Sequence, residues 1–171
     1  GCLGARPLNE HVPQALARIP TGERPVVLHQ TGEQHIDAVR AGYRDAGVEA
    51  QCAAFVEDVA SELASSDLVI CRAGATTLAE LTVCPLGAHD DCCSSAIGDH
   101  QTPTARRLVE PGAAIMLPQS ELSPERLAAL IASLDRSRLL DMASRARALG
   151  RPEAAQKVAE VCIELAVGAS R

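Results

Sequence analysis

The fold is decided by the stretch LVICRAGATTLAE, which occupies residues 68–80. Residues 68–71 form a short apolar run typical of a buried strand, and residues 77–83 have the spacing of a helix. Only a few small residues around Gly74 separate the two segments. Because ligands of open α/β folds bind where strands end and helices begin, this stretch also predicts the position of a site.

The same alternation of strand and helix continues on both sides of this stretch. Strands are predicted at residues 26–29, 50–56, 68–71 and 113–117, and helices at residues 9–19, 34–46, 59–65 and 77–83. Strict alternation implies crossover connections and a parallel sheet with helices on both faces. The predicted fold class is therefore α/β.

The last third of the chain is predicted to be helical. Helices are expected at residues 123–134, 138–149 and 152–167, with short breaks at Asp135 and Gly150. Ser123 as N-cap, followed by Pro124 in the first helical position, is a strong start signal. A helical C-terminal tail is therefore expected to close the domain.

Composition limits the classes of function. The 171 residues are enough for one domain with a substantial core. With one Phe, one Tyr, no Trp and a net charge of −6, the chain is not expected to bind nucleic acid. No run approaches the ~20 apolar residues of a membrane span and no signal peptide is visible, which predicts a cytoplasmic protein. The seven cysteines are expected to be reduced, because Cys52, Cys71 and Cys162 fall in apolar periodic segments.

Two places depart from the alternation. The chain opens on a glycine-rich turn with no strand before it, so we expect residues 1–171 to form one domain that lacks its first strand. The second place is residues 85–95, where the alternation requires a buried strand but the residues are too polar for a central one. We expect either an irregular exposed segment or a poorly paired strand there.

Two glycine-containing turns are candidates for phosphate binding. Gly1 and Gly4 precede a helix whose free N–H groups suit an anion, although a tight turn in any α/β protein looks the same. Residues 72–80 follow a strand in the same way, and Glu80 could accept hydrogen bonds from ribose hydroxyls. Thr77 and Glu80 also have the spacing of a capping box, so Glu80 is a candidate for either role.

Three further groups are ambiguous from the sequence. Phe55 stands at a strand end, where it could cover a planar base while the Val56 backbone reads the base edge, or it could lie in the core. Cysteine, histidine and aspartate crowd residues 84–93, but no pair has the spacing of a zinc site, so no metal is expected. Residues 99–101 suit either sugar hydroxyls or a helix N-cap.

Together, in order and spacing, these pieces resemble the MurG family of glycosyltransferases over essentially the whole chain. The corresponding segments are a truncated glycine loop at residues 1–6, His29-Gln30-Thr31-Gly32, Phe55-Val56-Glu57-Asp58, residues 71–80 and Asp99-His100-Gln101-Thr102. The resemblance implies the donor half of a GT-B fold, a Rossmann-like parallel sheet with helices on both faces and a helical C-terminal tail. It also implies an N-terminal acceptor domain, which these residues do not include.

The resemblance also assigns substrate-binding residues. It places uracil at the Val56 backbone, the diphosphate at the glycine loop and at the start of the helix after residue 74, ribose at Glu80, and the sugar hydroxyls at Gln101. The implied set is Cys2, Val56, Ala75, Thr76, Thr77, Leu78, Ala79, Glu80 and Gln101. On this interpretation Glu80 serves both as a cap and as a ligand.

The implied reaction transfers N-acetylglucosamine from UDP to a lipid-linked muramyl-pentapeptide in peptidoglycan synthesis, with inversion at the anomeric carbon. Helix dipoles and backbone N–H groups stabilise the leaving UDP, without an obligatory metal or a cofactor. The lipid-linked acceptor and the catalytic base belong to the acceptor domain, and the full-length protein is implied to lie peripherally at the cytoplasmic face of the bacterial inner membrane. The 171 residues alone are expected to bind UDP-N-acetylglucosamine without turnover.

Departures from the family pattern keep other functions open. Cys2 replaces the loop serine, and Thr104 replaces an asparagine. Residues 89–95 replace an apolar strand without a change in length. Two compensating frameshifts would produce this pattern, and divergence of a paralogue is the alternative. The alternatives are another GT-B transferase with a different UDP-sugar and a non-catalytic nucleotide-binding module. A dinucleotide-binding domain is disfavoured, because no acidic residue ends a second strand ~20 residues after the glycines.

Overall fold

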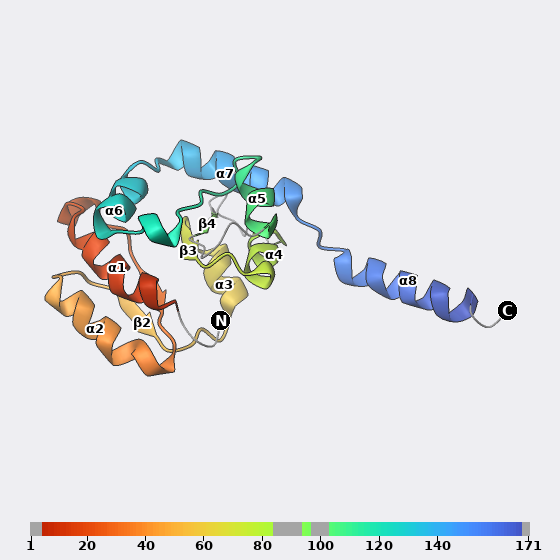
Figure 1. The fold of residues 1–171 in the computed structure, drawn as a ribbon, viewed down its shortest axis with the longest axis horizontal. Helices are drawn as coiled ribbons and strands as arrows, with labels where there is room; N and C mark the ends of the chain where they lie inside the picture. Colours follow the sequence, from red (N-terminus) through yellow and green to blue (C-terminus); the bar gives the residue numbers. More distant parts are fainter. Residues whose placement is uncertain (1–4, 84–93, 97–102, 169–171) are drawn as a thin grey trace.

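The computed structural model describes residues 5–83, 94–96 and 103–168, in which helices alternate with short strands (Figure 1). In chain order the elements are α1 (Arg6–Ala17), β1 (Leu28–Gln30), α2 (Ile36–Asp45), β2 (Gln51–Ala53), α3 (Val59–Ala64), β3 (Val69–Cys71), α4 (Ala75–Val83), β4 (Ser94–Ala96), α5 (Pro103–Val109), α6 (Pro124–Ala132), α7 (Arg136–Leu149) and α8 (Ala154–Gly168). Short 3-10 helices lie at Thr21–Glu23, Glu33–His35 and Gln119–Glu121. The alternation from β1 to α5 confirms the predicted α/β class.

The strands of the described residues pair in parallel, in two pairs. β1 lies beside β2 with His29 opposite Cys52, and β3 lies beside β4 with Ile70 opposite Ser95. A helix connects the two strands of each pair, which is the crossover that parallel pairing requires. Ile70 of β3 packs against the same core cluster as Cys52 of β2, so the two pairs belong to one body.

The strand predicted at residues 113–117 is wrong, because only Met116 makes a bridge there. The amides of Ala113 and Ala114 both donate to the Leu108 carbonyl, at 2.8 and 3.1 Å, and so they close the end of α5. Gly112 turns the chain with φ of 76°, a value that favours glycine. A turn, not a sheet, therefore buries the apolar side chains of this segment.

β4 occupies the place where the alternation requires a strand after α4. It spans Ser94–Ala96 and pairs with β3 in spite of its two serines. Residues 84–93, which carry most of the polar tract, lie outside the described residues. The expected irregular segment there, and the frameshift interpretation, therefore stay predictions.

Two apolar clusters form the greater part of the interior. The first joins α1, α2 and α6 to the β1–β2 pair, with Leu16, Tyr43 and Leu127 among its most buried members. The second joins α4, α5 and α7 around Leu78 and Leu108. In Figure 1 the first group of helices lies to the left of the body, with α4 and α5 to its right.

The C-terminal third is helical, as predicted. The Ser123 hydroxyl accepts a hydrogen bond from the Arg126 amide at 3.2 Å, and Pro124 opens α6, which confirms the start signal. Asp135 caps α7 in the same way through the Arg138 amide at 2.8 Å. This cap starts α7 at Arg136, two residues before the predicted start.

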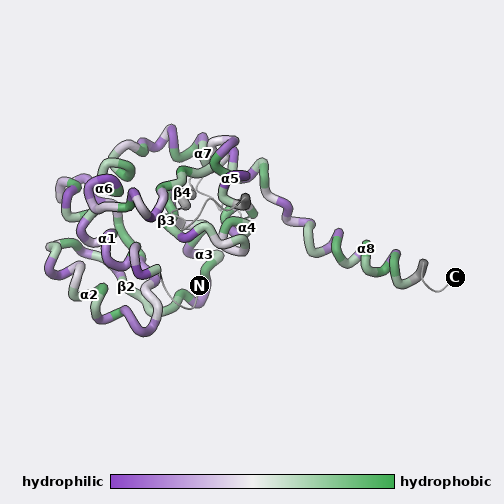
Figure 2. Tube along the Cα trace, in the orientation of Figure 1, coloured by the Kyte–Doolittle hydropathy of each residue, from purple (hydrophilic) through white to green (hydrophobic). Residues whose placement is uncertain are grey.

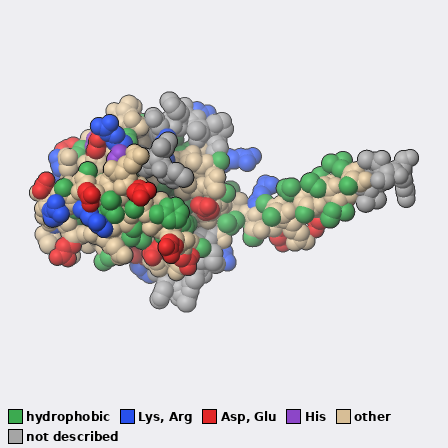
Figure 3. Space-filling model, turned by 90° about the horizontal axis from the view of Figure 1, so that it is seen from below, with side chains coloured by type: hydrophobic (Ala, Val, Ile, Leu, Met, Phe, Trp, Pro, Cys, Tyr) green, Lys and Arg blue, Asp and Glu red, His purple; other side chains and the backbone are tan. Residues whose placement is uncertain are grey.

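α8 extends away from the body, as Figures 1 and 3 show, so the expectation that the helical tail closes the domain is wrong for this last helix. It exposes four large apolar side chains, those of Val158, Val161, Ile163 and Leu165. Figure 2 shows hydrophobic residues recurring along this helix. Even so, none of the described helices is long and apolar enough to cross a membrane.

Candidate functional site

The candidate site lies where β1, β2 and β3 end, because each of these strands passes directly into a loop with exposed groups. The first two loops are tied together beyond the strands themselves. The Thr31 amide donates to the Ala53 carbonyl at 2.9 Å, and the Gly32 amide donates to the Ala54 carbonyl at 3.2 Å. Gly32 has φ of 81°, so the turn after β1 needs glycine at this position.

The loop after β2 exposes the chain's only phenylalanine. The side chain of Phe55 is 69% exposed, which excludes the alternative that it belongs to the core. Val56 follows it and is half-buried. Asp58 then caps α3 by accepting a hydrogen bond from the Ser61 amide at 3.0 Å. The bond to the Ala54 carbonyl holds one end of the loop, and the Asp58 cap holds the other. The aromatic face between them is left open to a planar ligand.

The loop after β3 leads into α4, whose first turn is the second anion-binding candidate. The first intrahelical bond runs from the Leu78 amide to the Gly74 carbonyl at 2.9 Å, so helix geometry leaves the amides of residues 75–77 without intrahelical acceptors. Ala75 and Thr76 are exposed at this end, and Thr77 is half-buried. Small exposed residues beside free N–H groups suit a phosphate group.

Glu80 is exposed one turn into α4. The helix begins at Ala75, so Thr77 is its third residue and not its N-cap, and the predicted capping box with Glu80 is wrong. Without that role, the carboxylate of Glu80 is free to accept hydrogen bonds from a ligand. Ala79 is exposed beside it, whereas the side chain of Leu78 is 1% exposed and packs in the second core cluster.

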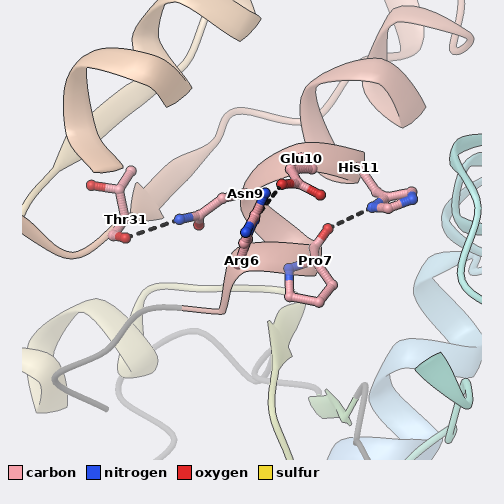
Figure 4. Close-up of polar contacts among 6 residues, drawn as sticks. All are labelled: Arg6, Pro7, Asn9, Glu10, His11 and Thr31. Carbon is pink, nitrogen blue, oxygen red and sulfur yellow. Dashed lines mark hydrogen bonds and ion pairs between the residues drawn. The ribbon is translucent and has the colours of Figure 1, made fainter. Parts of the chain in front are cut away.

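The first turn of α1 joins the three loops as a fourth element of the candidate site, because it directly follows the predicted glycine loop in the sequence. Arg6 and Glu10 form an exposed ion pair at 2.7 Å, and this hydrogen bond lowers the pKa of Glu10 (Figure 4). His11 bonds the Pro7 carbonyl at 2.7 Å. On the opposite side of the helix, Asn9 is buried and its amide nitrogen donates to the Thr31 carbonyl at 3.0 Å.

Asn9 also belongs to a polar group that joins two buried side chains, Asn9 and Tyr43, through the half-buried His29, and no spacing in the sequence identifies these three residues as a unit. His29 lies between the Asn9 amide oxygen, 3.0 Å from Nε2, and the Tyr43 hydroxyl, 2.9 Å from Nδ1. Burial lowers the pKa of His29 to about 4 and raises the pKa of Tyr43. The signals in the sequence were the place of His29 at the end of a predicted strand and in the segment His29-Gln30-Thr31-Gly32, which resembles the family.

Several predicted residues cannot be placed. Cys2 and Gln101 lie outside the described residues, as do the rest of the glycine loop and residues 99–100. Among the residues that the structure does describe, no three histidine, cysteine or acidic side chains gather as metal ligands would. Cys52, Cys71 and Cys162 are free thiols, as predicted, and burial raises the pKa of Cys71 to about 11.

Comparison with known proteins gives matches over nearly the whole chain. The family model for the glycosyltransferase family 28 C-terminal domain matches residues 1–159. Two curated relatives are 51% and 53% identical to this chain over 168 residues, and they come from Aromatoleum aromaticum and an Azoarcus species. Both are named UDP-N-acetylglucosamine--N-acetylmuramyl-(pentapeptide) pyrophosphoryl-undecaprenol N-acetylglucosamine transferase. Each of these matches covers 98% of this chain and 47% of the relative. The chain thus spans about half the length of the curated relatives that it matches.

A solved structure supports the same relationship at the level of the fold. The crystal structure of Acinetobacter baumannii MurG superimposes with a TM-score of 0.82 at 36% sequence identity. The match covers 94% of this chain and 47% of that one. The strands and helices described above therefore form a Rossmann-like α/β fold of the kind found in that protein.

Proposed function

The chain belongs to the glycosyltransferase family 28 C-terminal domains, and we propose that it forms the sugar-nucleotide-binding half of an inverting hexosyltransferase. The donor is UDP-N-acetylglucosamine, and the acceptor is a lipid-linked muramyl-pentapeptide of peptidoglycan synthesis. The observation that carries the proposal is about 50% identity to transferases of that name across nearly the whole chain. The acceptor, and a peripheral position at the cytoplasmic face of the inner membrane, belong to the proposal for the longer protein.

The donor is held in this proposal by groups at the ends of the strands. The exposed ring of Phe55 covers uracil while the Val56 backbone pairs with the base edge. The exposed carboxylate of Glu80 accepts hydrogen bonds from the ribose hydroxyls. The free amides at the start of α4 hold the diphosphate, together with the glycine loop that leads into α1. Cys2 in that loop and Gln101 complete the set toward phosphate and sugar.

The same groups explain how the leaving group is stabilised. When the acceptor displaces UDP at the anomeric carbon, negative charge grows on the β-phosphate. Amides fixed at a helix start meet that charge without reorganising, and the positive end of the α4 dipole adds to the stabilisation. The step is a single displacement with inversion, so the chain needs no nucleophile of its own.

A calorimetric titration with UDP-N-acetylglucosamine tests the proposal. Binding should be retained with UDP, should weaken with UDP-galactose, and should be absent with NADH. A chain that prefers UDP-galactose would be a different UDP-sugar transferase. One that binds nucleoside diphosphates without regard to the base would be a nucleotide-binding module of another kind.

Glu80→Gln tests the ribose contact within the same assay. The variant should fold normally, because the carboxylate is exposed and forms no capping box. Its binding free energy for UDP should be weaker by about 1–3 kcal/mol. Glu49→Gln is the matched control, since Glu49 is exposed just before β2, at the opposite end of that strand. Equal UDP affinity in the two variants would remove Glu80 from the site.

A further inference from the structure

The hydrogen bonds of Asn9, half-buried His29 and Tyr43 have one possible direction when the imidazole is neutral. The Thr31 carbonyl can only accept, so the Asn9 amide group at 3.0 Å from it must be the NH₂. The Asn9 oxygen then faces His29 Nε2 at 3.0 Å, so that nitrogen must carry the proton. Nδ1 is left with a lone pair, which accepts from the Tyr43 hydroxyl at 2.9 Å. A backbone carbonyl thus fixes the tautomer of His29.

Three different elements contribute to this chain of bonds. Asn9 lies in the first turn of α1, His29 in the middle of β1, and Tyr43 near the end of α2. Asn9 and Tyr43 are 7% and 3% exposed, and the rings of His29 and Tyr43 meet edge to face with centroids 5.7 Å apart. Both nitrogens of the imidazole are occupied, so His29 has no free lone pair with which to act as a base.

The chain of bonds continues into the candidate site. The Thr31 carbonyl accepts the hydrogen bond from Asn9, and the Thr31 amide donates to the Ala53 carbonyl. Gly32 then donates to Ala54, the residue before Phe55. The first turn of α1, on the phosphate side of the site, is therefore connected through the Thr31 turn to the loop on the base side.

We propose that His29 is a positioning residue for the nucleotide site, which holds Asn9 so that the first turn of α1 keeps its place relative to the Thr31 turn and the Phe55 loop. The proposal rests on the proposed function, since it assumes that the nucleotide contacts both sides. His29 acts through Asn9 and touches no ligand. Removal of the imidazole lets the first turn of α1 move relative to the Phe55 loop. The substitution therefore weakens UDP binding by more than a loss of stability explains.

Two substitutions of His29 separate the two roles. His29→Leu replaces the imidazole with an apolar side chain of similar size and removes both ring hydrogen bonds, and it should bind UDP about tenfold more weakly than the wild type. His29→Gln retains an amide donor that can reach the Asn9 oxygen, so its affinity should stay within about threefold. Both are measured by calorimetry at a temperature where circular dichroism shows each variant to be folded.

Leu127→Ala is the matched control for stability. Leu127 is fully buried in the same core cluster but belongs to α6, so its truncation destabilises the body without touching the hydrogen bonds. UDP affinity should be unchanged in this variant. If His29→Leu binds UDP as tightly as the control, or if His29→Gln binds as weakly as His29→Leu, the positioning role is wrong and the group is only structural.

The wild-type chain provides a second measurement that does not depend on any variant folding. Nitrogen-15 NMR of the histidine rings should show His29 protonated at Nε2, and its signals should shift when UDP is added. Nδ1 protonation, or signals that UDP leaves unchanged, would overturn the inference while the proposed function stands. Wild-type protein that fails to bind UDP in the titration would instead overturn the proposed function, and this inference with it.

Discussion

At the scale of single residues, His29 makes stability depend on pH. Burial lowers the pKa of His29 from 6.5 to about 4, so the folded state binds a proton at this ring more weakly than the unfolded chain does. The stabilisation is fully present above pH 6.5 and is lost as the pH falls toward 4. From pH 7 to about pH 4.5 the wild type should lose about 2 to 3 kcal/mol more than His29→Gln. Urea unfolding of both proteins at the two pH values measures this difference, and equal losses would contradict it.

Gly150, at the end of α7, is a residue for which space and not conformation requires glycine. Its φ of −63° is open to any residue, but an added Cβ would overlap the Thr82 carbonyl oxygen of α4. A backbone atom cannot give way cheaply, so Gly150→Ala should lower the free energy of unfolding by about 1–3 kcal/mol. Gly22→Ala is the control, because nothing lies within 4 Å of the added atom, and it should be neutral or slightly stabilising. Thermal unfolding of both variants measures the difference.

The residues of the candidate site were predictable to different degrees. Phe55 at a strand end and Glu80 in the helix after a strand could both be inferred from apolar runs, but their exposure could not. The capping-box alternative for Glu80 failed because the small residues 75–76 already take helical geometry, which a propensity argument leaves open. Asn9, His29 and Tyr43 lie far apart in the sequence, and only tertiary packing makes them one group.

At the scale of elements, α7 and α8 differ in what they contribute to the body. α7 packs against α4, whereas α8 leaves its large apolar side chains exposed. Two leucines, one on α8 and one on the packed helix α6, make the contrast between an exposed and a packed helix measurable. Leu165→Ala on α8 should change the free energy of unfolding by less than about 0.5 kcal/mol, because the side chain is 69% exposed. Leu127→Ala on α6, with a side chain that is fully buried, should cost about 2–5 kcal/mol. Chemical denaturation of the two variants checks this, and a comparable loss at Leu165 would mean that α8 packs on the body.

The strands show why type was easier to predict than extent. Apolar runs placed β1, β2 and β3 correctly, but each is three residues long where four to seven were expected. Apolar residues also continue into turns, as residues 113–117 show, where the amides bond Leu108 instead of a neighbouring strand. β4 shows the opposite case, since the backbone pairing of Ser94–Ala96 follows from the crossover and not from the apolar character of the strand.

At the scale of the whole molecule, the proposed nucleotide site draws on both core clusters. The Thr31 turn and the Phe55 loop extend from strands packed on the first cluster, and α4 is anchored in the second through Leu78. Parts of a protein that rest on different clusters can open separately, each with its own free energy. A ligand that contacts both must hold them in one arrangement, and it stabilises the folded state by mass action.

Hydrogen exchange tests this arrangement directly. Saturating UDP-N-acetylglucosamine should slow exchange both in residues 54–58 and at the start of α4, residues 75–80, because base, ribose and diphosphate contact the two segments at once. Uridine, which lacks the diphosphate, should protect the loop after β2 more than the α4 start. α8 is the internal control, since its exposed helix lies apart from the site and its exchange should not change. Protection confined to one of the two segments would show that the nucleotide rests on a single cluster, and that the binding mode proposed here is wrong.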